Sequence, residues 1–134
     1  MTPANPEKMP VRNSGDILLI RQTVRARTVE LGFSLVDQTK MVTAASELAR
    51  NTVDYGGGGY VIFEILNDGS RRGLRLTFED HGPGIPDISL ALKDGWTSGS
   101  GLGLGLSGAK RLVNDFHIES KVGQGTKVVI TRWK

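Results

Sequence analysis

The spacing of apolar residues changes once along the chain, and this change constrains the fold more than any other feature. In residues 16–31 and 35–54, apolar side chains recur every three or four positions, as on one face of an α-helix. After the glycines at 56–59, residues 61–66 and 74–79 instead follow a period of two, which is typical of half-buried strands. Two helices therefore precede the first pair of strands.

Capping and turn residues support the ends of these segments. Asp16 suits the start of the first helix and Gly32 its end, while Ser34 and Asp37 form a pair similar to a capping box at the start of the second. The remaining elements are a turn at 67–70, a short helix at 88–92, a helix from 104 or 106 to 116, and a hairpin of strands 117–122 and 126–133. This order predicts an α+β layer sandwich rather than a repeating strand–helix–strand unit.

Length and composition limit the kinds of protein that this chain can be. Its 134 residues predict one compact domain, and no apolar run approaches the roughly 20 residues that cross a bilayer. The net charge of +3 is spread along the chain, which argues against a nucleic-acid-binding surface. The absence of cysteine excludes disulfides, a thiolate nucleophile and sulfur-ligated metals, and two histidines are too few for a histidine-rich metal site. We expect a cytoplasmic protein that binds neither nucleic acid nor membrane.

The first fifteen residues differ in composition from the rest of the chain. Residues 1–15 carry three prolines and few apolar side chains, so we expect them to form a flexible N-terminal arm. A short edge strand near Val11 is compatible with this segment. Residues 16–134 are expected to form the folded domain.

The segment Asp80-His81-Gly82-Pro83-Gly84 directly follows the strand predicted at 74–79. A carboxylate at a strand end can point at a ligand, and glycines spaced by one allow the backbone to approach that ligand closely. On its own, this pattern is equally compatible with a plain turn.

Glu47 and Asn51 stand four residues apart on the second predicted helix, so they share one face. They either belong to a solvated outer face, or Asn51 offers its amide oxygen to Mg²⁺ while Glu47 acts as a general base. Their neighbours on this helix are largely apolar: Met41, Val42, Ala44, Ala45, Leu48, Ala49 and Val53. A carboxylate and an amide would be costly to bury among such residues without a purpose, and on this helix alone both interpretations stay open.

A glycine-rich segment at 99–108 matches two phosphate-binding patterns only in part. Residues 103–108 fit G-x-G-x-x-G, but no strand precedes them and no strand–helix–strand unit follows. Gly108-Ala109-Lys110 lacks the Gly-Lys-Ser/Thr of a Walker loop. The segment is either an uncharacterised flexible loop or a lid that leads into a helix start, where backbone amides can hold phosphates.

The order of these features resembles the GHKL ATP-binding family of gyrase, Hsp90, histidine kinases and MutL. Glu47 and Asn51 correspond to its N-box, and the Asp80 and glycine-rich segments to its adenine-site and lid boxes, followed by Gly125-Thr126 in the last hairpin. Within the family, the chain is most similar to the small serine/threonine kinases of the bacterial stressosome. The stretches that carry this similarity are 30–33, 36–38, 46–51, 79–88, 94–98 and 101–106.

The resemblance covers about residues 16–134 and implies a two-layer α/β sandwich of the GHKL (Bergerat) type. Its sheet is expected to be mixed but mostly antiparallel, with helices on one face. The chain departs from sensor histidine kinases at Asp54, where these often carry Lys or Arg. The four glycines at 56–59 also predict an unusually loose exit from the second helix.

The resemblance also implies roles for individual residues. Asp80 accepts a hydrogen bond from the adenine amine, Asn51 chelates Mg²⁺, Glu47 is the catalytic base, and Thr126 lies near the adenine edge. The full set of nucleotide-binding residues expected in this way is Asn51, Asp80, Gly82, Gly84, Gly99, Gly101, Leu102, Gly103, Leu104, Gly105 and Thr126.

The expected function is that of an ATP- and Mg²⁺-dependent serine/threonine protein kinase. The resemblance implies that it phosphorylates STAS-domain partners, as in the antagonist and scaffold proteins of a stressosome, and is then released to bind a downstream phosphatase or other output protein. Two alternatives remain open at this point. One is a sequestering module of the anti-sigma-factor type, and the other is a detached ATPase domain without a protein substrate.

Overall fold

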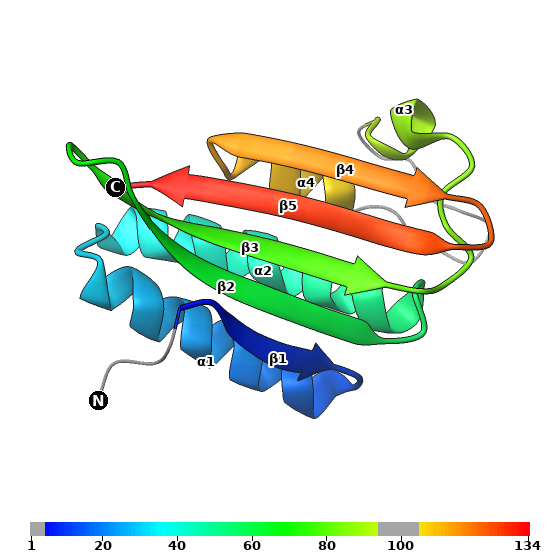
Figure 1. Cartoon of the computed structure of the whole chain (residues 1–134), viewed down its shortest axis with the longest axis horizontal. Coiled ribbons are helices and arrows are strands. Elements are labelled where there is room, and N and C mark those ends of the chain that lie inside the picture. The colour runs from blue at the N-terminus through cyan, green and yellow to red at the C-terminus, as the bar shows by residue number, and fades with distance from the viewer. Residues whose placement is uncertain (1–4, 94–104) are drawn as a thin grey trace.

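One layer of the molecule is a five-stranded sheet, and the other is formed by helices that cover one of its faces (Figure 1). The computed structural model describes residues 5–93 and 105–134. In chain order the elements are β1 (Glu7–Val11), α1 (Ser14–Glu30), α2 (Leu35–Asp54), β2 (Gly59–Asn67), β3 (Arg72–Asp80), α3 (Ile88–Ala91), α4 (Gly105–Arg111), β4 (Asp115–Lys121) and β5 (Gly125–Trp133). None of the helices in these two described stretches has the length and apolar character needed to span a membrane.

Side-chain caps set the starts of the two long helices. The Ser34 hydroxyl accepts a hydrogen bond from the Asp37 amide at 3.1 Å, and α2 has the bounds that the sequence predicts. α1 begins earlier than expected, because Asn13 rather than Asp16 is its cap: the Asn13 side chain accepts from the Asp16 amide at 2.9 Å. Asp16 is instead buried and paired with Arg12 at 3.0 Å.

The strand order in the sheet is β1-β2-β3-β5-β4, and every pairing among the described strands is antiparallel. The residues of the three inner strands that face the helices are buried, as period-two alternation requires: Val61, Phe63, Leu74, Leu76, Phe78, Val128 and Ile130. They form one core with the apolar face of α2, including Met41, Ala45 and Leu48. Each large apolar side chain buried in this way contributes about 1.5–3 kcal/mol.

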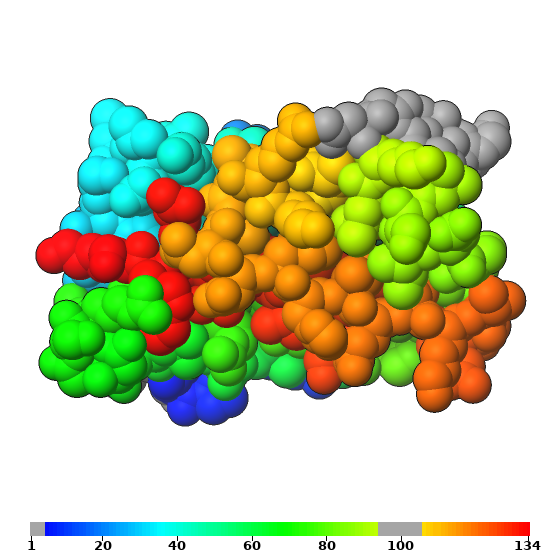
Figure 2. Space-filling model, turned by 90° about the horizontal axis from the view of Figure 1, so that it is seen from above, coloured from blue at the N-terminus to red at the C-terminus, as the bar shows by residue number. Residues whose placement is uncertain are grey.

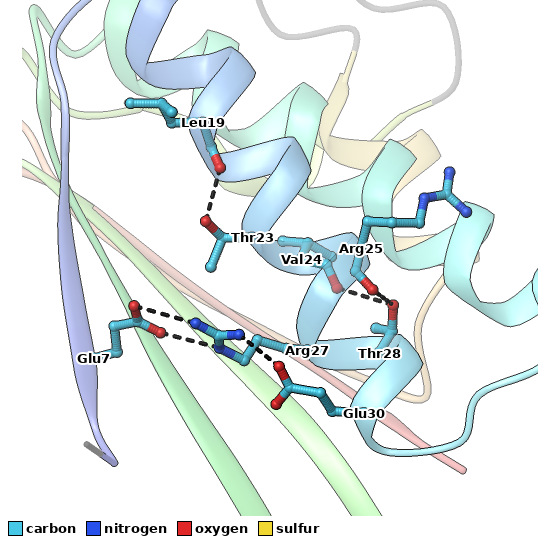
Figure 3. Close-up of polar contacts among 8 residues, drawn as sticks. All are labelled: Glu7, Leu19, Thr23, Val24, Arg25, Arg27, Thr28 and Glu30. Carbon is cyan, nitrogen blue, oxygen red and sulfur yellow. Dashed lines mark hydrogen bonds and ion pairs between the residues drawn. The ribbon is translucent and has the colours of Figure 1, made fainter. Parts of the chain in front are cut away.

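The segment that precedes α1 contributes an edge strand. β1 pairs with β2 in the register Glu7 opposite Phe63. The Arg27 guanidinium on α1 donates to the Glu7 carboxylate at 3.2 Å and to Glu30 at 2.9 Å, so it links the edge strand to the helix layer (Figure 3). The sequence was compatible with a strand here but did not require one. β1 brings the sheet to five strands.

The helix predicted to reach residue 116 is shorter than expected, and this part of the prediction is wrong. α4 ends at Arg111, and Phe116 lies in β4 opposite Ile130. The side chains of β4 alternate between exposed and half-buried, with Phe116 and Ile118 turned inward. Phe116 continues the helical spacing of Leu112 and also alternates with Ile118, so it fits both periods, and pairing with β5 decides in favour of a strand.

The segment that connects β3 to α3 is fastened on two sides. The Tyr55 hydroxyl, just after α2, donates to the Gly84 carbonyl at 2.9 Å. The Ser120 hydroxyl on β4 accepts from the Ile85 amide at 2.7 Å, and the Gly123 amide donates to the Pro83 carbonyl at 2.8 Å. Seen from above, this yellow-green segment accordingly lies beside the orange β4 and the β4–β5 turn (Figure 2).

A further ion pair joins β5 to α2. The Arg132 guanidinium donates to the Asp37 carboxylate at 2.6 Å and to the Leu112 carbonyl at 2.9 Å. The hydrogen bond from Arg132 lowers the pKa of Asp37 below its ordinary value. The pair connects the first turn of α2 to the last strand.

Gly84→Ala should destabilise the protein by about 2 kcal/mol or more, because its φ is +76° and an added Cβ would meet the Lys121 carbonyl. Gly57 has the same φ of +76° with no atom within 4 Å of the added Cβ, so Gly57→Ala isolates the backbone strain. Chemical unfolding of both variants measures the difference. Equal losses in the two variants would show that the contact with Lys121 is unimportant.

Asp37→Asn should lower the free energy of unfolding by about 1–2 kcal/mol at neutral pH, through loss of a charge-assisted hydrogen bond. Because folding lowers the Asp37 pKa, its contribution is present above the ordinary aspartate value of about 4 and is lost as the pH falls through the lowered value. Urea unfolding at several pH values should therefore show the difference from the unmodified protein shrinking in acid. The exposed Asp54 provides the control, since Asp54→Asn should not reduce stability at any pH.

Candidate functional site

A pocket lies between the two layers, where the C-terminal half of α2 meets the end of β3 and the start of β5. Its lining residues come from α2, from β3 and the loop that follows it, from α4 and from β5: Leu48, Asn51, Thr52, Tyr55, Phe78, Asp80, Ile85, Leu106, Thr126 and Val128. Half of them are apolar, and the other half carry one polar group each: Asn51, Thr52, Tyr55, Asp80 and Thr126. This composition is typical of a small-molecule site, in which polar groups fix the orientation of a largely apolar ligand surface.

Asp80 is the buried carboxylate of this pocket. It is the last residue of β3, and its side-chain oxygen Oδ1 accepts hydrogen bonds from the Gly82 amide at 2.9 Å and the Thr126 amide at 3.3 Å. Burial raises the pKa of Asp80 above its ordinary value, and these two hydrogen bonds oppose the rise only in part. Within residues 5–93 and 105–134, no group donates a hydrogen bond to Oδ2. One oxygen is therefore fixed by the backbone, and the other can accept from a ligand.

Glycines make room for this carboxylate. An added Cβ at Gly56 would meet the Asp80 carboxyl group, and one at Gly125 would meet the Asp80 carbonyl. At Gly82 it would come within 2.7 Å of the Gly56 backbone. The three segments thus pack at a distance that side chains would not permit.

Gly56 belongs to the glycine run at 56–59, which predicted a loose exit from α2. The exit is instead held by hydrogen bonds. The Gly56 amide donates to the Asn51 carbonyl at 3.0 Å, and the Gly58 amide donates to the Thr52 carbonyl at 2.8 Å, so the end of α2 is capped. Sequence reasoning missed the role of Gly56 beside Asp80. No local signal points to this contact, because Gly56 and Asp80 lie far apart in the sequence.

The other predicted residues of α2 and β5 occupy different positions relative to the pocket. Asn51 is half-buried and lines it, and Thr126 is buried and lines it from β5. Glu47 lies one helical turn before Asn51, is half-buried, and is not part of the pocket lining. Ser120 was also missed by sequence reasoning, although its hydroxyl lies 2.8 Å from that of Thr126.

The predicted residues of the glycine-rich segment fall largely beyond the described stretches. Gly99, Gly101, Leu102, Gly103 and Leu104 lie outside the described residues. Gly105 is the first residue of α4, and the next residue, Leu106, lines the pocket. Leu106 therefore places the start of α4 at the pocket.

The pocket does not resemble a metal site built from protein ligands alone. In the part of the chain that the structure describes, no three histidine or carboxylate side chains cluster so that they could hold a metal ion. Asn51 offers one amide oxygen, and Asp80 offers one free carboxylate oxygen.

Comparison with known proteins agrees with this geometry. Residues 36–134 match the family described as histidine kinase-, DNA gyrase B- and HSP90-like ATPase. The structure is also similar in fold to the mycobacterial sensor histidine kinase MprB, with a TM-score of 0.57 and 19% identity over 96% of this chain and 97% of the other.

Two relatives are similar to this chain over most of their length. The serine/threonine-protein kinase RsbT of Bacillus subtilis is 45% identical over 88% of this chain and 89% of its own. The anti-sigma F factor of Anoxybacillus flavithermus is 29% identical over 84% of this chain and 80% of its own. Together with the family match and the Asp80 pocket, these relationships mean that the chain belongs to the histidine kinase-, DNA gyrase B- and HSP90-like (GHKL) ATPase family.

Proposed function

We propose that this protein is an ATP- and Mg²⁺-dependent serine/threonine protein kinase that phosphorylates a STAS-domain partner. The observation that carries the proposal is the meeting of Asn51, Asp80 and Thr126 in one largely apolar pocket. The relative with 45% identity is named a serine/threonine-protein kinase, which supports transfer to a hydroxyl group rather than to water or histidine.

Adenine fits the inner part of the pocket. Its flat apolar faces suit walls made by side chains such as Leu48, Phe78 and Val128. Its amino group would donate to the free Oδ2 of Asp80, whose Oδ1 is already held by backbone amides. Gly82 and Gly84 would contribute by fixing the loop around this carboxylate, which needs their lack of side chains.

Mg²⁺ is compatible with the donor set around Asn51. A single amide oxygen is a suitable hard ligand for this ion, which usually keeps waters and takes its other ligands from substrate phosphates. When bound, Mg²⁺ would supply neutralisation of charge on the phosphates. Asn51 would hold the ion at the pocket edge, and Gly99, Gly101, Leu102, Gly103, Leu104 and Gly105 would surround the phosphates.

Glu47 is the proposed catalytic base. It lies one turn from Asn51 and outside the adenine pocket, which suits a group that acts beside the phosphates. Glu47 would take the proton from a serine or threonine hydroxyl of the partner as that oxygen bonds to the γ-phosphorus. The bond between the γ-phosphorus and the β–γ bridging oxygen breaks, and ADP leaves with the electron pair.

The partners we propose are STAS-domain antagonist and scaffold proteins of the stressosome type, followed by a downstream phosphatase or similar output protein. These follow from the similarity to stressosome kinases. We expect the protein to act in the cytoplasm, where ATP and such partners occur together.

A second candidate function is sequestration of a regulatory protein, as the name of the anti-sigma F factor relative suggests. The observation that favours it is a set of exposed apolar side chains on α1 and at the start of α2: Leu18, Leu19, Val29, Leu35 and Val36. Leu35 lies about 24 Å along α2 from Asn51. A partner could therefore bind there without entering the nucleotide pocket.

Glu47→Ala should reduce phosphate transfer to a STAS-domain protein by about 10²–10⁴-fold while ATP affinity stays nearly unchanged, because a general base acts on transfer and not on binding. The assay follows phosphoserine and phosphothreonine on the partner, with ATP affinity measured by calorimetry. Glu64→Ala is the matched control, since it removes a carboxylate from the opposite face of the sheet. Full transfer by Glu47→Ala would exclude Glu47 as the base. Stable complex formation with no transfer by the unmodified protein would favour sequestration.

ATP affinity should weaken as the pH is lowered through the Asp80 pKa, because the protonated carboxyl can no longer accept from the adenine amine. Since burial raises this pKa, the loss should begin above the ordinary aspartate value of about 4. The raised pKa also means that ionised Asp80 destabilises the unliganded fold as the pH rises, so Asp80→Asn should lose ATP affinity without losing stability. Calorimetry with Mg·ATP across this pH range measures the affinity, and chemical unfolding measures the stability of Asp80→Asn. A pH profile of affinity shared by Asp80→Asn would refute the assignment.

A further inference from the structure

Ser120 is the centre of a hydrogen-bond cluster directly beside the pocket. Its hydroxyl oxygen accepts from the Ile85 amide at 2.7 Å, and it lies 3.0 Å from the Gly125 carbonyl oxygen and 2.8 Å from the Thr126 hydroxyl. Ser120 does not line the pocket, whereas Thr126 does. Ser120 can therefore influence a ligand through Thr126 or through Ile85, which both line the pocket.

The number of protons in this cluster decides how the hydroxyls are oriented. A serine hydroxyl has one proton to donate and two lone pairs to accept with, while the Gly125 carbonyl can only accept. If Ser120 donates to Gly125, its two lone pairs are filled by the Ile85 amide and by the Thr126 hydroxyl, and every group is paired. The reverse arrangement, with Ser120 donating to Thr126, takes the proton away from Gly125. Because polar groups in protein interiors are almost always paired, the first arrangement is favoured.

We propose that Ser120 is a positioning residue that holds the Thr126 proton away from the pocket and thereby makes the site selective for a 6-aminopurine. In this arrangement Thr126 and Asp80 both present lone pairs to the ligand. The proposal rests on the function proposed above, in that it assumes a purine nucleotide in this pocket.

Two hydrogen-bond acceptors side by side can both accept from an amino group, whereas they repel the lone pairs of a carbonyl oxygen. The amino group of adenine has two protons to donate. Hypoxanthine, the base of ITP, has a carbonyl oxygen at the same position and no exocyclic amine, so its acceptor would face two further acceptors. A site whose polar groups are left unpaired by an analogue discriminates against it, and we expect ATP to bind about 10–100-fold more tightly than ITP.

Ser120→Ala removes the group that accepts the Thr126 proton. The Thr126 hydroxyl is then free to turn and donate to the ITP carbonyl, so the preference for ATP over ITP should fall by about tenfold, the value of one hydrogen bond. Ser120→Thr keeps the hydroxyl and should keep the preference. Affinities for Mg·ATP and Mg·ITP are measured by calorimetry on the full chain, and unfolding curves verify that each variant is folded.

Thr126→Val provides the second test, because it removes the hydroxyl and leaves Ser120 its contacts with Ile85 and Gly125. Thr126→Val alone should also reduce the preference, and adding Ser120→Ala to it should change the preference no further. A preference unaltered in Ser120→Ala or in Thr126→Val would overturn the proposal, as would an equal effect of Ser120→Ala in both backgrounds. Should Ser120→Ala fail to fold, an unaltered preference in Thr126→Val would still overturn the proposal. Failure of the unmodified protein to bind either nucleotide would instead refute the proposed function itself, and this inference with it.

Discussion

The hydrogen bonds that hold the Asp80 carboxylate at the end of β3 are the constraint on which the rest of this site depends. A buried carboxylate is unfavourable unless donors compensate for the lost water. Here the donors are main-chain amides of Gly82 and Thr126, from the following loop and from the neighbouring strand. Both segments must therefore approach the carboxylate to within hydrogen-bond distance, and the close packing at Gly56, Gly82 and Gly125 is the consequence.

The same requirement explains why the loop after β3 is so firmly held. Tyr55 fastens it to the end of α2, and Ser120 and Gly123 fasten it to β4 and the β4–β5 turn. A loop that carries binding groups is effective when a rigid scaffold positions it. Tyr55 directly follows α2, the helix that carries Asn51 and Glu47, so the adenine end and the phosphate end of the proposed site share one rigid element.

The sequence predicted those parts of the structure that local signals determine. α2 has its predicted bounds because a capping serine, a long helical period and a glycine stop agree with one another. Phe116 was misplaced because it fits both the helical spacing of Leu112 and the strand alternation with Ile118, and only pairing with β5 decides. Asp80, Asn51 and Thr126 were predicted from motif order, and the structure brings all three to one pocket. Gly56 and Ser120 instead act through contacts between segments distant in sequence. No local pattern could have shown that Gly56 makes room for Asp80 or that Ser120 meets Thr126.

All of the proposed roles require that a nucleotide binds between α2 and the end of β3. Backbone amide NMR shifts during titration with Mg·ATP locate the bound nucleotide, because each amide reports on its own surroundings. We expect the largest shifts at Gly82 and Thr126, together with the side-chain amide of Asn51. Shifts confined to the open face of the sheet, around Glu64, Arg75 and Lys127, would contradict this binding site, since that polar groove lies on the far side of the sheet from α2.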